Sequence, residues 1–174
     1  MARWSGAATL GCATDGDSNE KGDVMFKTII WATDGSEAAD RALPTALELT
    51  AEANGRLLVV HANERLGGRA GGGPVFADEE DLQRKLETKA HDLLESGVNA
   101  SFHVVSGLNT DPADLIADVA KESDADLIVV GTRGHGRVAG MLLGSVTQGL
   151  LHVAPCPVLA VPPKVAVSSM VGIA

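Results

Sequence analysis

The 174-residue sequence predicts one α/β domain, a doubly wound five-stranded parallel sheet with helices on both faces. Two observations favour this Rossmann-like class. Short apolar segments alternate with helical patterns along the chain. Several of these segments are apolar throughout, which is typical of parallel strands buried on both faces. With right-handed crossovers, we expect the strand order 3-2-1-4-5.

Composition indicates a single aliphatic core. Apolar residues make up 45% of the chain and aromatic residues 3%, so Ala, Val, Leu and Ile must fill the interior. We expect the domain to cover residues 25–163. Residues 1–24 have no apolar periodicity, so we interpret them as a flexible N-terminal extension, and residues 164–174 as a C-terminal tail.

A strand over Lys27–Ala32 opens the predicted sheet, and a helix follows it. Ser36 is a good N-cap, and acidic residues in the first turn complement the helix dipole. Pro44 removes one helical hydrogen bond, so we expect a bend there. Asn54-Gly55 is expected to end the helix.

The middle of the chain begins with a second strand, Leu57–Ala62, and a glycine-rich stretch, residues 67–73. An amphipathic helix is expected from Asp78 to Gly97. One face of it carries the apolar residues Leu82, Leu86, Ala90, Leu93 and Leu94.

The third strand is expected over Ser101–Val105. Asp111 then caps a helix with Pro112 at its first position, where proline is well tolerated. Its buried side is expected to hold Leu115, Ile116, Val119 and Ala120. Leu127–Val130, a helix over Ser145–Ala154 and a strand over Pro157–Val161 complete the fold.

A glycine-punctuated segment follows the fourth strand: Gly131-Thr132-Arg133-Gly134, nine further residues, then Gly144-Ser145. Glycines let backbone N–H groups approach an anion, and the first turn of a helix offers free donors and a positive dipole end. We interpret the segment as a nucleotide-phosphate site. The alternative is that the glycines only shape a surface loop. The segment is neither a P-loop nor a dinucleotide fingerprint.

A second signal points to the same place. In the order 3-2-1-4-5 the switch point lies between strands one and four, whose carboxyl ends are Asp34 and Gly131. Arg133, His135 and Arg137 add positive charge to this loop of a chain with net charge −9. Alternatively, these three are solvated loop charges.

Other sequence features exclude several classes. An acidic chain with a pI near 4.9 is not expected to bind nucleic acid. No apolar run approaches the ~20 residues of a membrane span, and the first 24 residues lack a secretory signal, so we expect a cytoplasmic protein. Cys12 and Cys156 have no partners at metal-ligand spacing. Without a Walker lysine or a nucleophile elbow, no catalytic residue is assigned.

The chain resembles the universal stress protein family, in its ATP-binding branch, over about residues 25–163. The resemblance rests on Ala32–Ser36 after the first strand, on Val60-His61-Ala62 after the second and on the glycine spacing from residue 131 to Ser145. The closing segment Pro155–Val161 also matches.

The resemblance implies ATP with Mg2+ as the ligand and a homodimer formed through the final strand, Val158–Val161. An apolar strand at a sheet edge would by itself invite pairing with a second copy. The implied nucleotide-binding residues are Asp34 beside the ribose or adenine, Ala62 against the base, Val130 and Gly131 along base and sugar, and Gly134, Gly144, Ser145 and Val146 around the phosphates. From the residues alone, Asp34 is also a plausible helix-start carboxylate and Ala62 an ordinary packing residue.

Three functions follow. The first is a cytoplasmic ATP-binding stress sensor or regulatory dimer that is read by a partner protein. The second is a slow ATPase or phosphotransferase that uses the same cleft. The third is a nucleotide-free dimeric interaction module.

Overall fold

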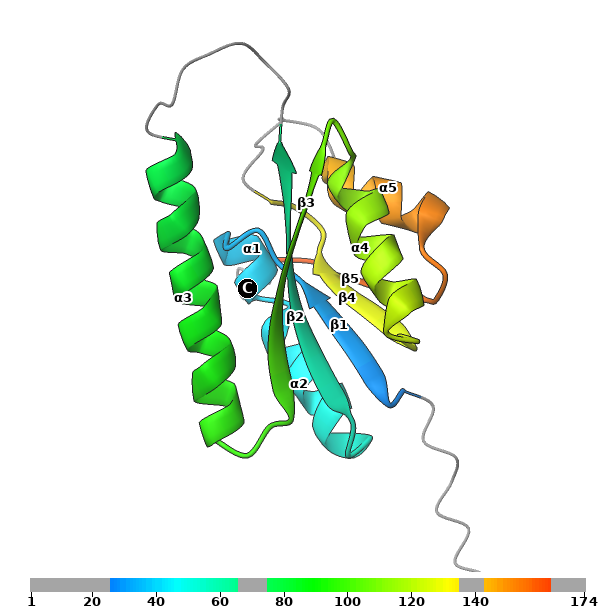
Figure 1. Cartoon of the computed structure of the whole chain (residues 1–174). Helices are drawn as coiled ribbons and strands as arrows, with labels where there is room; N and C mark the ends of the chain where they lie inside the picture. Colours follow the sequence, from blue (N-terminus) through cyan, green and yellow to red (C-terminus); the bar gives the residue numbers. More distant parts are fainter. Residues whose placement is uncertain (1–25, 66–74, 135–142, 164–174) are drawn as a thin grey trace, which may run out of the picture.

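The computed structural model describes residues 26–65, 75–134 and 143–163, and within these ranges the predicted fold is confirmed (Figure 1). The strands form one parallel sheet in the order β3-β2-β1-β4-β5, as the sequence predicts. Their bounds are Thr28–Ala32 (β1), Arg56–Arg65 (β2), Ala100–Leu108 (β3), Leu127–Gly131 (β4) and Val158–Val161 (β5).

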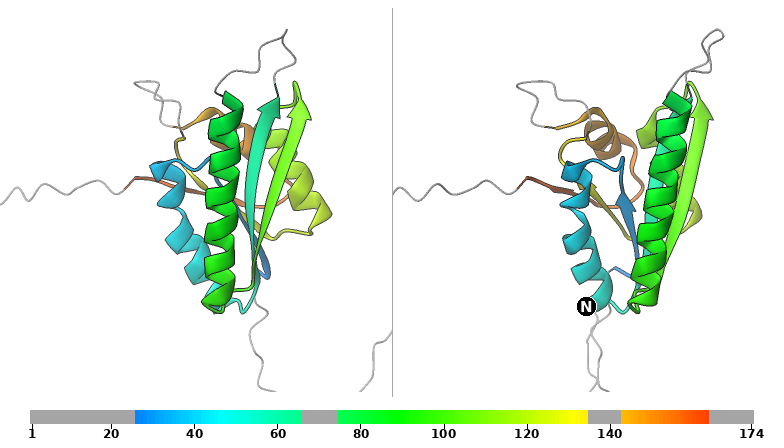
Figure 2. Two further views of the ribbon diagram at one scale, coloured as in Figure 1. Left: turned by 60° about the vertical axis from the view of Figure 1, so that its left-hand side comes forward. Right: turned by 90° about the vertical axis from the view of Figure 1, so that its left-hand side faces the viewer.

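Helices cover both faces of the sheet (Figures 1 and 2). The chain winds outward from β1 to β3 and then crosses back to β4 and β5, so right-handed crossovers place the two sets of helices on opposite faces. One face carries α1 (Glu37–Asp40), α2 (Leu43–Glu52) and α3 (Val75–Glu95), and the other carries α4 (Pro112–Glu122) and α5 (Ser145–Val153).

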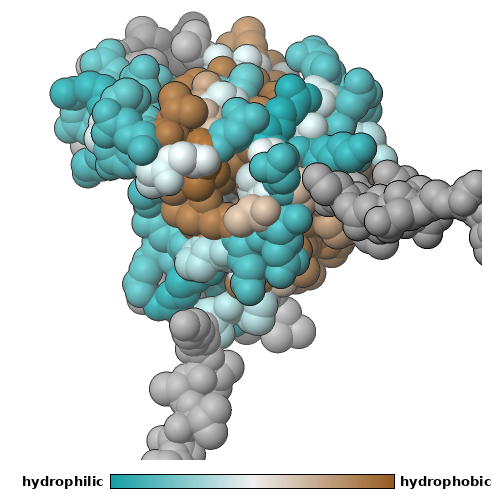
Figure 3. Space-filling model, turned by 90° about the horizontal axis from the view of Figure 1, so that it is seen from below, coloured by the Kyte–Doolittle hydropathy of each residue, from teal (hydrophilic) through white to brown (hydrophobic). Residues whose placement is uncertain are grey.

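Two apolar layers form the core, one on each face of the sheet. Alternate residues of β1 enter different layers: Ile29 and Trp31 pack beneath α2 and α3, whereas Ile30 and Ala32 pack beneath α4 and α5. Every residue of β1 and β4 is buried, which explains their unbroken apolar sequence. Figure 3, seen from the end where the strands begin, shows apolar surface around a central hollow with a hydrophilic margin.

The first helical region differs from the prediction at Pro44. Ser36 is confirmed as an N-cap, because its hydroxyl accepts the Ala39 N–H. The expected bend is instead a break, since α1 ends before α2 begins, and Pro44 lies in the first turn of α2, where a missing N–H costs no helical bond. After α2, Asn54 adopts a φ of 46°, so the asparagine makes the left-handed turn.

Helix α3 begins at Val75, three residues before the predicted start, and ends before Gly97, which has a φ of 93°. Leu86 and Ala90 are buried, but Leu94 is 52% exposed, so the apolar face that the sequence predicts is buried only in part. A position one residue beyond Leu93 turns by about 100° around the helix axis and points away from the sheet.

Strands β2 and β3 are longer than predicted. Their pairing continues through polar residues, up to Arg65 opposite Leu108, whereas the sequence predicts that both strands end with their apolar runs. Asp111 is confirmed as the N-cap of α4, with its carboxylate accepting the Ala113 N–H, and Pro112 as its first residue.

Several expectations fall on residues that the structure does not describe. The N-terminal extension 1–24, the glycine-rich stretch 67–73 and the C-terminal tail 164–174 lie outside the described ranges. Within those ranges, no helix combines the length and the apolar character that crossing a bilayer requires.

Candidate functional site

A cavity of about 1190 Å³ opens at the carboxyl ends of the strands, at the switch point between β1 and β4. It is bounded by the ends of β1 and β4, by Ala62 of β2, by α1 and by the first turns of α4 and α5. All eight residues expected around a nucleotide line it: Asp34, Ala62, Val130, Gly131, Gly134, Gly144, Ser145 and Val146. Two separate sequence signals therefore meet in one cavity.

One part of the cavity is apolar. Its lining residues include Ala32, Ala62 and Val130 from the three neighbouring strands β1, β2 and β4, and Pro112 and Ile116 from the start of α4. Small side chains leave room above the sheet, and an apolar wall suits a flat ring system. The sequence analysis missed Pro112 and Ile116, although a helix that follows β3 must begin at this same edge of the sheet.

The N-terminus of α5 supplies hydrogen-bond donors. The first bond of its helical ladder runs from the Gln148 N–H to the Gly144 carbonyl, at 2.9 Å. The N–H groups of Ser145, Val146 and Thr147 precede that ladder, and no described residue accepts a hydrogen bond from them. Such a cluster of donors with the helix dipole behind it favours an anion.

Two contacts hold this helix start in place. The Thr147 hydroxyl is buried and donates to the Gly131 carbonyl at 2.8 Å, which ties α5 to the end of β4. The Gly144 N–H donates to the Thr132 carbonyl at 2.8 Å. This second bond corrects one expectation: the Gly144 amide serves the loop itself and is not one of the open donors.

Gly144 nevertheless has a place in the cavity wall. A β-carbon there would meet no atom closer than 3.6 Å, and the backbone φ of −71° suits any residue. The fold does not require glycine at this position, so the missing side chain leaves space that belongs to the cavity.

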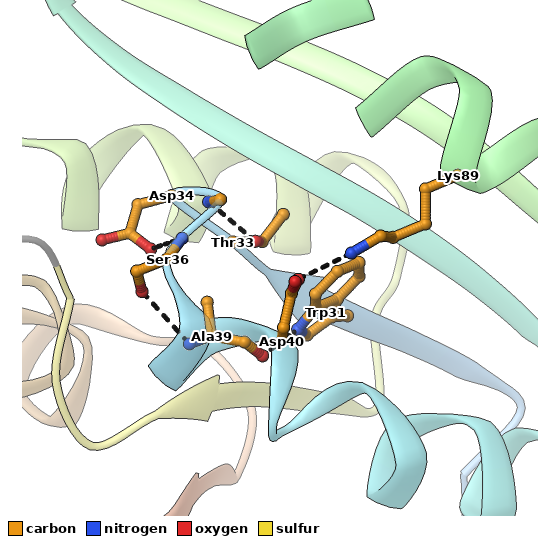
Figure 4. A network of polar contacts seen from close by, with 8 residues as sticks. Trp31, Thr33, Asp34, Ser36, Ala39, Asp40 and Lys89 are labelled. Carbon is orange, nitrogen blue, oxygen red and sulfur yellow. Dashed lines mark hydrogen bonds and ion pairs between the residues drawn. The ribbon is translucent and has the colours of Figure 1, made fainter. Parts of the chain in front are cut away.

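The contacts of Asp34 fit both interpretations of this residue, as a carboxylate at the start of a helix and as part of the nucleotide site. Its Oδ1 accepts the Ser36 N–H at 3.0 Å, as a carboxylate at the start of a helix does (Figure 4). Its side chain also lines the cavity. A β-carbon on Gly134 would lie 2.2 Å from Oδ2 of Asp34, so glycine is what allows the loop after β4 to approach this carboxylate.

Gly131 is required by packing. A β-carbon there would lie 2.6 Å from the carbonyl oxygen of Ala38, so the glycine lets α1 pack directly on the end of β4. For this one position, the interpretation of the glycines as purely structural is supported by the contact.

Helix α1 is a single turn at the rim of the cavity, and neighbouring side chains anchor it (Figure 4). The indole N–H of Trp31 donates to the Ala39 carbonyl at 3.0 Å. Lys89 of α3 donates to Asp40 at 2.7 Å, and its ammonium lies 5.5 Å from the centre of the Trp31 ring. Strand β1 and helix α3 therefore fix the wall that α1 contributes.

The charged residues that line the cavity include two that the sequence prediction of the site leaves out, Glu37 and Arg41. Arg133 lines the cavity as expected, and Arg41, the residue directly after α1, lines it too and pairs with Glu37 one helical turn earlier. The four-residue spacing of Glu37 and Arg41 was a usable signal. His135 and Arg137 lie outside the described residues.

No preformed metal site or activated thiol is found in the parts of the chain that the structure describes. Those ranges hold no group of three His, Cys, Asp or Glu side chains placed to bind a metal ion. Burial, together with the nearby carboxylate of Asp126, raises the pKa of the Cys156 thiol, which keeps it protonated, and Cys156 does not line the cavity.

The chain is similar to known proteins both in sequence and in structure. The model of the universal stress protein family matches residues 25–162. A Thermus aquaticus protein, named as the universal stress protein in the QAH/OAS sulfhydrylase 3′ region, is 44% identical over 142 residues, which cover 79% of this chain and 99% of that protein.

Two solved structures with similar folds contain nucleotides. A universal stress protein in complex with cAMP is 28% identical, with a TM-score of 0.61, and the match covers 79% of this chain and 97% of that one. An Archaeoglobus fulgidus universal stress protein in complex with dAMP is 26% identical, with a TM-score of 0.58, and the match covers 78% and 98%.

Proposed function

The chain belongs to the universal stress protein family, and we propose that it is an ATP-binding stress regulator whose nucleotide occupies the cavity between β1 and β4. The observation that carries this proposal is that one cavity has both an apolar wall and a group of backbone hydrogen-bond donors. An apolar wall from three strands and α4 bounds the same cavity as the start of α5, whose first N–H groups donate to no described residue. A nucleotide has one apolar end and one anionic end, so it satisfies both features.

The apolar wall is assigned to the base and the sugar. Ala62 and Val130 would pack against the base, with Gly131 along the sugar and Asp34 within reach of a ribose hydroxyl. The two relatives solved with cAMP and dAMP support an adenine nucleotide as the ligand class.

The start of α5 is assigned to the phosphates. The amides of Ser145 and Val146, the Ser145 hydroxyl and the backbone at Gly134 would hold phosphate oxygens, and Arg133 would balance their charge. Mg2+ is usually bound through substrate phosphates and water rather than by an all-protein cage, so we propose that it arrives with ATP.

We assign binding rather than turnover to this cavity. Fast phosphoryl transfer needs a cationic clamp and a group that positions water. The described lining residues include two arginines but neither lysine nor histidine. Bound ATP would then act by ordering the residues that line the cavity, and a partner protein would recognise this ordered form.

A homodimer through β5 completes the proposal. β5 is an edge strand, and Leu159 at its centre is 37% exposed. An exposed apolar strand with unpaired backbone groups favours pairing with a second copy of the chain.

Calorimetric titration with Mg-ATP tests the binding proposal. We expect saturable binding with one site per chain, and a rise in unfolding free energy of about 2.7 kcal/mol at a ligand concentration of 100 times Kd. Absence of binding at millimolar Mg-ATP, in protein that melts cooperatively, would contradict the proposal and favour a nucleotide-free interaction module. Steady phosphate release above the buffer rate would favour the slow ATPase.

A further inference from the structure

His61 is a buried histidine that the proposed nucleotide site does not use. It lies in β2, directly before Ala62 of the cavity wall, and is only 4% exposed. Val60 and Ala62 pack toward α4 and α5, whereas the His61 ring reaches Glu79 on α3, across the other face of the sheet. The residue therefore connects the back of the cavity to α3.

Both ring nitrogens of His61 face acceptors. Nδ1 lies 2.9 Å from the carbonyl oxygen of Thr33, and Nε2 lies 2.8 Å from Oε1 of Glu79. A carbonyl can only accept, so Nδ1 must carry a hydrogen. Nε2 and a carboxylate then need a further proton between them, either on the ring or on the carboxyl group.

Both ring contacts are therefore satisfied only when His61 and Glu79 together hold one proton more than a neutral imidazole and a carboxylate. Without that proton, the lone pair of Nε2 would face the lone pairs of Oε1 at hydrogen-bond distance, and the contact would be repulsive. One of the two ring contacts would have to open.

The contacts of the pair reach the nucleotide cavity. Thr33 is the residue before Asp34, and its N–H donates to the Val60 carbonyl at 2.9 Å. On the other side, Glu79 also accepts a hydrogen bond from Gln83, at 2.9 Å. The chain of contacts therefore runs from α3 through β2 to the end of β1, where Asp34 begins the cavity wall.

The charged groups around the ring are few among the described residues. From α3 it meets Glu79, and from β1 it meets the Thr33 carbonyl, followed in sequence by the carboxylate of Asp34. From β3 the residue paired with it is the uncharged Val104.

We propose that His61 is a positioning residue, which holds Asp34 at the nucleotide through a proton shared with Glu79, and that loss of this proton weakens nucleotide binding. This inference rests on the proposed function, because it assigns a role to a residue behind the same cavity. It predicts that the affinity for ATP falls as the pH rises.

The variant Glu79→Gln tests whether nucleotide binding depends on the shared proton or only on the hydrogen bonds that His61 and Gln83 make to residue 79. Both His61 and Gln83 contact Oε1 of Glu79, so the amide nitrogen of the glutamine would stand at that position. One of its N–H groups can donate to Nε2 of a neutral His61, and the other to the carbonyl of Gln83 once the Gln83 amide turns by 180°. Both contacts are then kept without the extra proton. We expect this variant to bind ATP tightly over the whole pH range, whereas the wild-type protein loses affinity by about tenfold, the effect of one charge-assisted hydrogen bond.

The chain offers a matched control on the same helix. His91 also pairs with a glutamate, Glu95, at 3.4 Å, but its side chain is 66% exposed and is not among the residues that line the cavity. His91→Gln should keep the wild-type pH dependence. His61→Phe, which removes both contacts, should bind weakly at every pH.

The experiment measures the Kd for Mg-ATP between pH 6 and pH 9 for the wild type, Glu79→Gln and His91→Gln. The glutamine variant also corrects for titration of the nucleotide itself, because that contribution is common to all three proteins. A wild-type loss of affinity that Glu79→Gln lacks supports the inference. Parallel profiles for these two proteins overturn it and leave the proposed function intact, whereas no binding by the wild type at any pH overturns both.

Discussion

Gly134 lies so close to Asp34 that a β-carbon on the glycine would stand 2.2 Å from the carboxylate oxygen Oδ2. The two residues come from different strand ends, and they are joined only because β4 is the neighbour of β1 in the sheet. The contact brings the acidic end of β1 against the glycine loop that leads to α5. At this contact, the part of the cavity lined by the end of β1 meets the part lined by the loop after β4.

Gly134→Ala should therefore weaken nucleotide binding. The new methyl group must displace either the Asp34 carboxylate or the loop, and a displaced wall should raise the Kd for Mg-ATP by tenfold or more, which is about 1.4 kcal/mol. Gly144→Ala is the control for fold stability, because its β-carbon meets only ordinary contacts and its N–H bond to Thr132 remains. Thermal melting of both variants and calorimetric titration of Gly134→Ala and the wild type check this, and equal affinity of these two proteins would contradict it.

The sequence predicts a large part of this arrangement, because the signals involved are local. Unbroken apolar strands, the caps at Ser36 and Asp111 and the glycine spacing depend on neighbouring residues, and the order 3-2-1-4-5 then places Asp34 beside Gly131. The bond from the Gly144 amide could not be predicted in this way, since it depends on how the loop closes.

Contacts between elements that are far apart in the sequence also could not be predicted from local patterns. His61 reaches Glu79 only because α3 crosses β2 at a particular height and rotation, and no local pattern records that angle. Leu94 shows the same limit: its apolar character suggested burial, but the rotation of α3 on the sheet exposes it.

Gly131→Ala should destabilise the fold itself. The β-carbon would lie 2.6 Å from the backbone carbonyl of Ala38, and a backbone atom cannot rotate away as a side chain can. Overpacking of this kind costs about 1–3 kcal/mol. Urea unfolding without nucleotide measures the change directly. A variant as stable as the wild type would show that α1 adjusts freely, against the anchoring by Trp31 and Lys89.

Ser145→Ala should affect binding but not stability. Ser145 is exposed at the first position of α5, and the helix has no side-chain cap whose loss would matter. We expect the free energy of unfolding to change by less than about 0.5 kcal/mol. Loss of a hydroxyl contact to phosphate should weaken Mg-ATP by roughly 1 kcal/mol, about fivefold. Adenosine, which lacks phosphates, provides the control ligand: if its affinity falls as much as that of ATP, Ser145 does not face the phosphates.

Leu159→Lys should disrupt the proposed dimer. A lysine at the centre of β5 would place a charge in the strand where a second copy pairs, and burying an unpaired charge is costly. The control is Val104→Lys in β3, the opposite edge of the sheet, where the exposed fraction is 41% against 37% for Leu159. Sedimentation at several protein concentrations should give a dimer for the wild type and Val104→Lys, and a monomer for Leu159→Lys. If Val104→Lys dissociates and Leu159→Lys does not, the copies associate through β3, and the apolar face of β5 has another partner.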